Sequence, residues 1–281
     1  MSEKLTIREN RIYNMNLMRT YRLLHITDAH LLHMDENETP ERAAYAQPRI
    51  DSVFCQDDIT SAERFGMLLD YIKEKSAQEE LDGVIFTGDI LDFPSEANLR
   101  FLRESLESLK IPYVYTLGNH DWSYFDDYHT PKSKILNRPR FAEFTGGNTY
   151  IHKKHIGEIC VIALDNTLDG YEDGVFEAFE EAIRGEENVL VVQHVPFYAE
   201  TLHDDTVKVW RRDLCIGGEG FKINGNWKKI YDLIVSDASP VMAVITGHLH
   251  FWHEDLLDGG IPQYVTSQSA FGNAQEFVIG G

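Results

Sequence analysis

Three polar side chains in a row, those of Asn119, His120 and Asp121, directly follow an apolar run that ends at Leu117 and Gly118. An amide, an imidazole and a carboxylate in this order can bind a cation, carry a proton and accept hydrogen bonds. Gly118 permits a tight turn or a close approach of the backbone to a bound group. The pattern therefore marks the end of this run as a candidate site of chemistry.

Similar polar groups follow other apolar runs. In chain order they are Asp28, His30, Asp89, Asn119, His120, His194, His248 and His250, with Gly88, Gly118 and Gly247 beside them to allow close backbone approach. All carry oxygen or imidazole donors and none carries a thiolate, a set that suits Mn, Fe or Zn. The alternative is a collection of unrelated turns, solvated strand ends and a core histidine. Because each group ends a separate predicted strand, their co-occurrence favours a metal site.

The runs that carry these groups are continuous and β-branched, which is typical of strands buried on both faces. The predicted strands are 21–27, 83–87, 111–117, 158–164, 189–193 and 241–246. Helical patterns lie between them at 61–75, 95–109, 174–184 and 227–235, the second with Ser95 as its N-cap. This alternation predicts an α/β fold whose strands deliver their carboxyl ends, and the polar groups on them, to one edge.

No linker divides the chain, so we expect a single domain over residues 1–281. Two segments, about 31–58 and 196–226, interrupt the rhythm and are expected to be long insertion loops beside the site. Several aromatic side chains could wall a substrate there, although core packing is expected for most of them. They are Trp122, Tyr124, Phe197, Tyr198 and Trp210.

The charge and the cysteines limit the partners and the compartment. Asp and Glu number 46 against 26 Lys and Arg, so the formal charge is −20 and stable binding of nucleic acid is not expected. No stretch approaches the ~20 apolar residues of a membrane span, and no secretory signal is recognisable, so no membrane partner is expected. Three widely spaced cysteines, Cys55, Cys160 and Cys215, favour a reduced, cytoplasmic setting.

The ordered blocks of polar residues resemble those of the calcineurin-like metallophosphoesterase family over about residues 23–250. The blocks are Asp28-x-His30, Gly88-Asp89-Ile90-Leu91-Asp92, Gly118-Asn119-His120-Asp121, His194 and Gly247-His248-Leu249-His250. The resemblance implies two β-sheets packed face to face and flanked by α-helices, with the metal site at the carboxyl ends of strands. It also implies two divalent metal ions, with Mn expected ahead of Fe or Zn.

The resemblance assigns a role to each matched residue. Asp28, His30, Asp89 and His250 would hold one ion, and Asp89, Asn119, His194 and His248 the other, with the Asp89 carboxylate bridging both. His120 would be the catalytic histidine and Asp121 the acceptor that fixes its ring. Asp92 is expected either to support His30 or His120 or to be a carboxylate at a helix start.

The expected reaction is hydrolysis of phosphate mono- or diesters. Two ions about 3.5–4 Å apart lower the pKa of a shared water, and the bridging hydroxide attacks phosphorus while His120 stabilises charge or acts as general acid. The substrate would be a small phosphorylated molecule, possibly a nucleotide. The alternatives are a phosphodiesterase for (cyclic) nucleotides, disfavoured by Asp121 where some such relatives carry Glu, and a non-catalytic scaffold, disfavoured by the complete ligand set.

Overall fold

A computed structural model describes residues 4–281 with the exception of 169, 215, 218–222 and 224. Cys215 and part of the segment 196–226 therefore lie outside the described residues. Among the described residues no helix is both long and apolar enough to cross a membrane.

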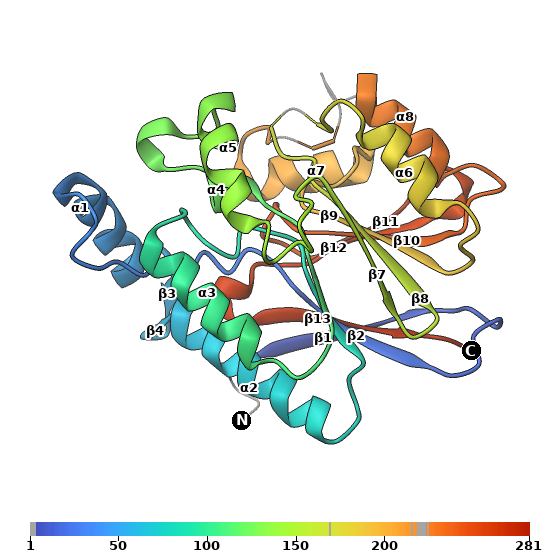
Figure 1. The fold of residues 1–281 in the computed structure, drawn as a ribbon, viewed down its shortest axis with the longest axis horizontal. Helices are drawn as coiled ribbons and strands as arrows, with labels where there is room; N and C mark the ends of the chain where they lie inside the picture. Colours follow the sequence, from blue (N-terminus) through green and yellow to red (C-terminus); the bar gives the residue numbers. More distant parts are fainter. Residues whose placement is uncertain (1–3, 169, 215, 218–222, 224) are drawn as a thin grey trace.

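Two β-sheets pack face to face, and helices lie against their outer faces (Figure 1). The first sheet has the order β1 (Thr6–Ile12), β13 (Asn273–Ile279), β2 (Tyr21–Ile26), β5 (Gly83–Phe86) and β6 (Tyr113–Tyr115). The second has the order β11 (His253–Leu256), β12 (Pro262–Val265), β10 (Val241–Thr246), β9 (Val189–Gln193), β8 (Ile159–Leu164) and β7 (Ile151–Ile156). A short hairpin joins β3 (Cys55–Gln56) to β4 (Ile59–Thr60). This is the fold that the sequence predicted.

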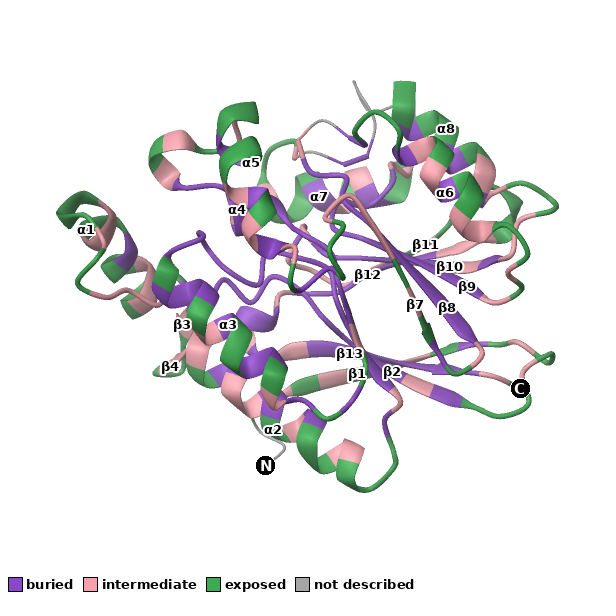
Figure 2. Ribbon diagram, viewed as in Figure 1, coloured by how far each residue is buried: buried purple, intermediate pink, exposed green. Residues whose placement is uncertain are grey.

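Apolar side chains from both sheets form the layer between them, as the buried strands in Figure 2 show. Leu23 and Ile85 of the first sheet belong to the same buried cluster as Val161 and Ile245 of the second. Burial of an aliphatic side chain of this size contributes about 1.5–3 kcal/mol relative to leaving it exposed. The continuous apolar runs therefore hold the two sheets together because each strand buries both faces.

The four predicted helices are present, with ends that differ by a few residues from those expected. They are α2 (Ser61–Ala77), α3 (Glu96–Ser108), α6 (Val175–Ile183) and α8 (Gly225–Ile234). Helices α2 and α3 pack on the first sheet, and α6 and α8 pack on the second. Ser95 caps α3 as predicted, since its hydroxyl accepts from the Asn98 N–H at 3.0 Å.

Helices also occur in both segments that were expected to be insertion loops, so that expectation is wrong for part of each. Segment 31–58 contains α1 (Pro40–Pro48) and a turn of π-helix (Arg49–Val53), and segment 196–226 contains α7 (Glu200–Trp210). Pro40 is the first residue of α1, a position that favours proline. Thr39 caps that turn by accepting from the Arg42 N–H. The connections near the site are therefore more ordered than their composition indicates.

The carboxyl ends of the central strands meet at one edge of the sandwich. Strands β2, β5 and β6 are parallel, as are β8, β9 and β10. A hydrogen bond joins the two sheets at this edge, because the backbone N–H of His248 after β10 donates to the side-chain carboxylate of Asp28 after β2 at 2.9 Å. The fold thus places the polar groups of both sheets side by side.

Candidate metal centre

The strand ends bring the predicted site residues together. Asp28 and His30 follow β2, Asp89 follows β5, Asn119 and His120 begin α4 (Asn119–Trp122) after β6, His194 follows β9, and His248 and His250 follow β10. Three overlapping groups of carboxylate and imidazole atoms result, each with all its ligand atoms within 4.8 Å of one another. The groups are Asp28, His30 and His250; His30, Asp89 and His120; and Asp89, His194 and His248.

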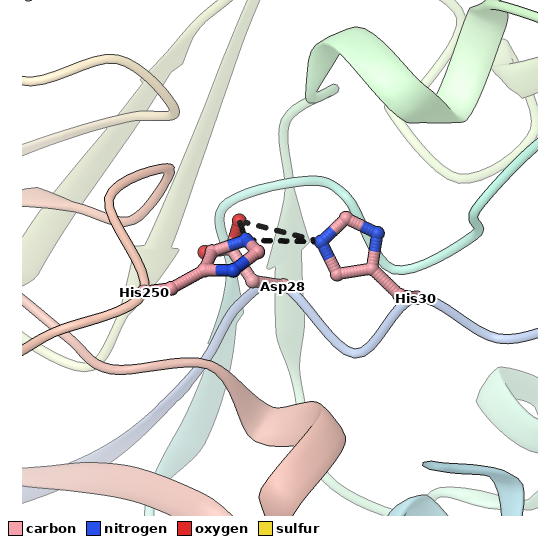
Figure 3. Close-up of side chains that lie close together, drawn as sticks. All are labelled: Asp28, His30 and His250. Carbon is pink, nitrogen blue, oxygen red and sulfur yellow. Dashed lines mark hydrogen bonds and ion pairs between the residues drawn. The ribbon is translucent and has the colours of Figure 1, made fainter. Parts of the chain in front are cut away.

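The first group has three potential metal-ligand atoms that face one another (Figure 3). Asp28 Oδ1 lies 3.2 Å from His250 Nε2 and 4.0 Å from His30 Nε2, and the two imidazole nitrogens are 3.1 Å apart. Asp28 Oδ1 is buried and has no hydrogen-bond partner. A buried carboxylate oxygen without a donor is costly by itself, so its position among two imidazole nitrogens fits a cation site.

Asp89 connects this group to the other one. Its Oδ2 lies 3.2 Å from His194 Nε2, which in turn lies 3.2 Å from His248 Nδ1. An oxygen of the same carboxylate also lies within 4.8 Å of a ring nitrogen of His30 and of a ring nitrogen of His120. Asp89 is therefore the residue that faces both halves of the site.

Hydrogen bonds outside the centre orient two of the imidazoles. His30 Nδ1 lies 3.0 Å from Asp92 Oδ1, and His194 Nδ1 lies 2.7 Å from the carbonyl oxygen of Thr87. Each acceptor takes the Nδ1 proton, which leaves the Nε2 lone pair for a ligand. This arrangement is typical of histidines that bind metals.

Burial and charge set the protonation of the donors. Burial lowers the pKa of His30, and burial together with His194 lowers the pKa of His248 to about 3, so both rings are neutral. Burial also lowers the pKa of His194, but the Asp89 and Asp28 carboxylates outweigh it and raise that pKa to about 9. A cation bound by the same carboxylates would replace this proton, as metal binding generally does.

Five of the predicted ligands have a left-handed backbone conformation. Their φ angles lie between 45° and 72°, at Asp28, His30, Asp89, His248 and His250. Only a few per cent of residues other than glycine adopt such angles, at a cost of about 1–3 kcal/mol each. Strain of this kind persists where packing and hydrogen bonds dictate it, and it clusters at functional sites. Here the left-handed conformation turns side chains at the ends of β2, β5 and β10 into the centre.

Two glycines allow the strand ends to approach one another. A Cβ atom on Gly118 would overlap the Asp89 carboxylate, and one on Gly247 would overlap Thr27 and Asp28. Both positions border proposed ligands, which confirms the close approach expected from the sequence.

The family model of the calcineurin-like phosphoesterases matches residues 21–251, a span that includes every one of these groups. The chain belongs to the calcineurin-like phosphoesterase family.

Solved structures with the same fold include two phosphatases of low sequence identity. A dimetal phosphatase from Danio rerio is 14% identical, with a TM-score of 0.54, and the comparison covers 89% of this chain and 88% of that one. A purple acid phosphatase from yellow lupin (Lupinus luteus) seeds is 11% identical with the same TM-score, and covers 92% of this chain and 45% of the lupin chain. No curated protein matches the sequence. These likenesses show the calcineurin-like fold.

Asp121 has a different task in this calcineurin-like phosphoesterase from the one predicted. Its Oδ2 accepts from the backbone N–H groups of Gly118 at 2.8 Å and Asp89 at 3.0 Å, and its Oδ1 accepts from that of Leu91 at 2.9 Å. The predicted contact with the His120 ring is therefore wrong. Asp121 is in the first turn of α4, where a carboxylate turns back to the N–H groups before the helix. It holds the backbone that carries Asp89.

Replacement of Asp121 by alanine is expected to lower the free energy of unfolding by about 3 kcal/mol, because three buried N–H groups lose their acceptor. Urea denaturation in the presence of a chelator measures this without a contribution from metal. Asp70→Ala, at an exposed position on α2, is the control and should change stability by less than about 0.5 kcal/mol. Unchanged stability of Asp121→Ala would contradict the backbone role.

Asp92 has the role that was predicted for Asp121, since its carboxylate contacts the His120 ring. Of the two roles expected for Asp92, the structure therefore favours support of His30 and His120. His120 Nδ1 lies 3.2 Å from both the Asp92 Oδ1 atom and the Asp92 carbonyl oxygen, and His30 shares the carboxylate. Arg49 binds it through Nε at 2.5 Å and Nη2 at 2.6 Å. Burial opposes ionisation, but His120, His30 and Arg49 hold the pKa of Asp92 well below its usual range. No pattern in the sequence marks Arg49, which lies in the segment expected to be a loop.

The aromatic residues divide between core and site. Trp122, Tyr124 and Phe197 are buried, which confirms core packing for these three. Trp210 is half-buried and its ring centroid lies 5.5 Å from that of His250. Tyr128, which was not among the predicted residues, is half-exposed and its ring centroid lies 5.3 Å from that of His120.

Proposed function

We propose that this chain hydrolyses phosphate mono- or diesters of small molecules with the help of two divalent metal ions. Asp28, His30, Asp89 and His250 would hold one ion, and Asp89, Asn119, His194 and His248 the other. The observation that carries the proposal is the position of Asp89, whose carboxylate belongs to the ligand groups on both sides. Imidazole, carboxylate and amide donors without thiolate suit Mn, Fe or Zn, and we propose Mn as the first metal to test.

When bound, two such ions lower the pKa of a shared water and neutralise phosphate oxygens. The chain itself supplies the orientation. Asp92 and the Thr87 carbonyl fix the rings of His30 and His194. Donation of the Asn119 side-chain N–H to the Tyr128 hydroxyl, at 3.0 Å, leaves the amide oxygen of Asn119 for the ligand role.

His120 is proposed to act on the substrate rather than on a metal. Its Nδ1 faces Asp92, so Nε2 is the atom left for the substrate. Its side chain is 20% exposed and that of the proposed ligand His250 is 19% exposed, so both lie on the open side of the centre, whereas Asp28, Asp89 and His194 are buried. Burial lowers the pKa of His120, but the Asp89 and Asp92 carboxylates raise it to about 9. The imidazolium would stabilise charge on the leaving oxygen or give it a proton.

The proposal is tested by turnover of p-nitrophenyl phosphate and bis-p-nitrophenyl phosphate with added Mn, together with elemental analysis of the purified protein. We expect bound metal and turnover of at least one substrate, and the preferred one distinguishes monoesterase from diesterase. A purified protein that contains no bound metal and turns over neither substrate would favour a non-catalytic scaffold of the same fold.

Asp92→Asn is expected to lower kcat about 10–100-fold at saturating Mn, because the residue supports the ring of His120, and to weaken metal affinity, because it also supports the ring of His30. Loss of the Asp92 charge removes one cause of the raised pKa of His120, so the decline of activity at high pH should begin at lower pH. A pH profile of kcat/KM measures the shift.

Arg49→Ala is the matched control, because it is expected to shift the pKa of His120 in the opposite direction. The Arg49 guanidinium lowers the pKa of His120, so its removal should move the decline of activity to higher pH. Equal shifts in the same direction for both variants would contradict the assignment of these charges to His120.

A further inference from the structure

Tyr128 occupies a half-exposed position at the edge of the centre, and its backbone is firmly held. It lies between the 3-10 turn Phe125–Asp127 and α5 (Pro131–Asn137). The Thr130 hydroxyl donates to Asp127 at 2.6 Å on one side, and the following residue, His129, has a left-handed φ of 57° and stacks on the buried Trp122. The phenol is 50% exposed in spite of these anchors. A rigid segment therefore presents an aromatic hydroxyl to solvent beside the site.

The hydrogen bonds of this hydroxyl leave its proton available. The Asn119 side-chain nitrogen is a donor only, so at 3.0 Å from the Tyr128 oxygen it must donate to it. The other neighbour of the oxygen is His120 Nε2, at 3.4 Å, which is longer than a good hydrogen bond. A tyrosine hydroxyl carries one hydrogen and two lone pairs. The hydrogen therefore has no well-placed acceptor among the described residues.

The position of His120 indicates which oxygen could accept that hydrogen. Two donors 3.4 Å apart can both reach one oxygen atom at about 2.7–3.0 Å, the usual hydrogen-bond distance. His120 Nε2 is the atom proposed above to face the leaving oxygen of the substrate. An oxygen placed between the two groups would thus receive a hydrogen bond from each.

We infer that Tyr128 is a further substrate-contacting residue, whose hydroxyl donates to the leaving-group oxygen of the phosphoester beside His120. The inference rests on the proposed function and adds a second donor to it. The hydroxyl keeps its own proton and forms one hydrogen bond that strengthens as negative charge develops on the leaving oxygen. It matters most for esters of weakly acidic alcohols, whose leaving oxygens carry the most charge.

Tyr128→Phe removes only the hydroxyl, and a series of aryl phosphates with leaving phenols of increasing pKa tests the inference. With saturating Mn, we expect kcat/KM to fall about 100-fold for phenyl phosphate, at the lower end of the range seen when one such donor is lost, and only about 10-fold for p-nitrophenyl phosphate, whose leaving oxygen carries less charge. If the substitution only disturbed the orientation of Asn119, it would weaken metal binding and lower kcat/KM by the same factor for every substrate. The dependence on the leaving group therefore separates substrate contact from support of the metal ligand.

Tyr124→Phe is the matched control, since its hydroxyl donates to the Pro94 carbonyl oxygen at 2.9 Å in the core. It should leave the dependence on the leaving group unchanged. A uniform loss across the series, or no loss, in Tyr128→Phe with an active wild-type protein would overturn this inference and leave the proposed function standing. A wild-type protein that turned over neither aryl phosphates nor bis-p-nitrophenyl phosphate would overturn both.

Discussion

Replacement of Asp89 by alanine is expected to remove bound metal and to lower kcat/KM by more than about 100-fold, the upper end of the effect of residues that merely support a ligand. The reason is that this carboxylate faces both ligand groups, so its loss weakens both ion sites together. It also accepts a hydrogen bond from the backbone N–H of His120 at 2.7 Å, which connects the metal site to the residue proposed to act on the substrate. Elemental analysis and turnover with added Mn measure the two effects.

Asp89→Asn separates loss of charge from loss of the side chain. Asparagine can still accept from the His120 N–H, so the local backbone should be retained, as circular dichroism and the unfolding midpoint would show. Metal content should nevertheless fall, because an amide has no negative charge to bring to two cations. Full stoichiometric metal in Asp89→Ala would show that the bridging assignment is wrong.

His120→Ala is expected to have the opposite combination of effects, with metal retained and kcat lowered about 10²–10⁴-fold, as for the loss of a general acid. His120 is outside the proposed ligand sets, and Asp92 keeps His30 and Arg49 as partners when the ring is removed. Loss of metal equal to that of Asp89→Ala would instead make His120 a ligand.

The pH profile gives His120 a second test. The proposal makes the imidazolium the active form, and the carboxylates raise its pKa to about 9, so activity should fall as pH rises through that pKa. Bound cations oppose the increase, which moves the decline to lower pH but does not change its direction. His120→Ala should lack this decline, whereas His155→Ala, at an exposed pair with Glu186 on β7, should keep it.

The strand ends were predictable because the signal for them is local. An apolar run of five to seven residues followed by Asp, Asn or His indicates both the strand and the group that it carries, as at residues 83–87 before Asp89. Strands β1 and β7 were missed because they are sheet edges whose residues are mostly polar and at least partly exposed, so they form no apolar run.

The residues that support the site were harder to predict because their positions depend on how connecting segments fold. Arg49 reaches Asp92 from the turn after α1, 43 residues earlier in the chain. Tyr128 reaches His120 from the connection between the 3-10 turn Phe125–Asp127 and α5. Asp121 was adjacent in sequence to His120, but helical geometry directs it to the backbone of Gly118 and Asp89. Adjacency in sequence was a poor guide to contact.

Diffraction from crystals of the manganese-loaded protein, recorded at the manganese absorption edge, tests the central claim most directly. Two anomalous peaks about 3.5–4 Å apart, with the Asp89 carboxylate between them, are the expected result. A single peak remote from Asp89, or none at saturating manganese, would contradict the claim that side chains from both sheets converge to hold a pair of cations.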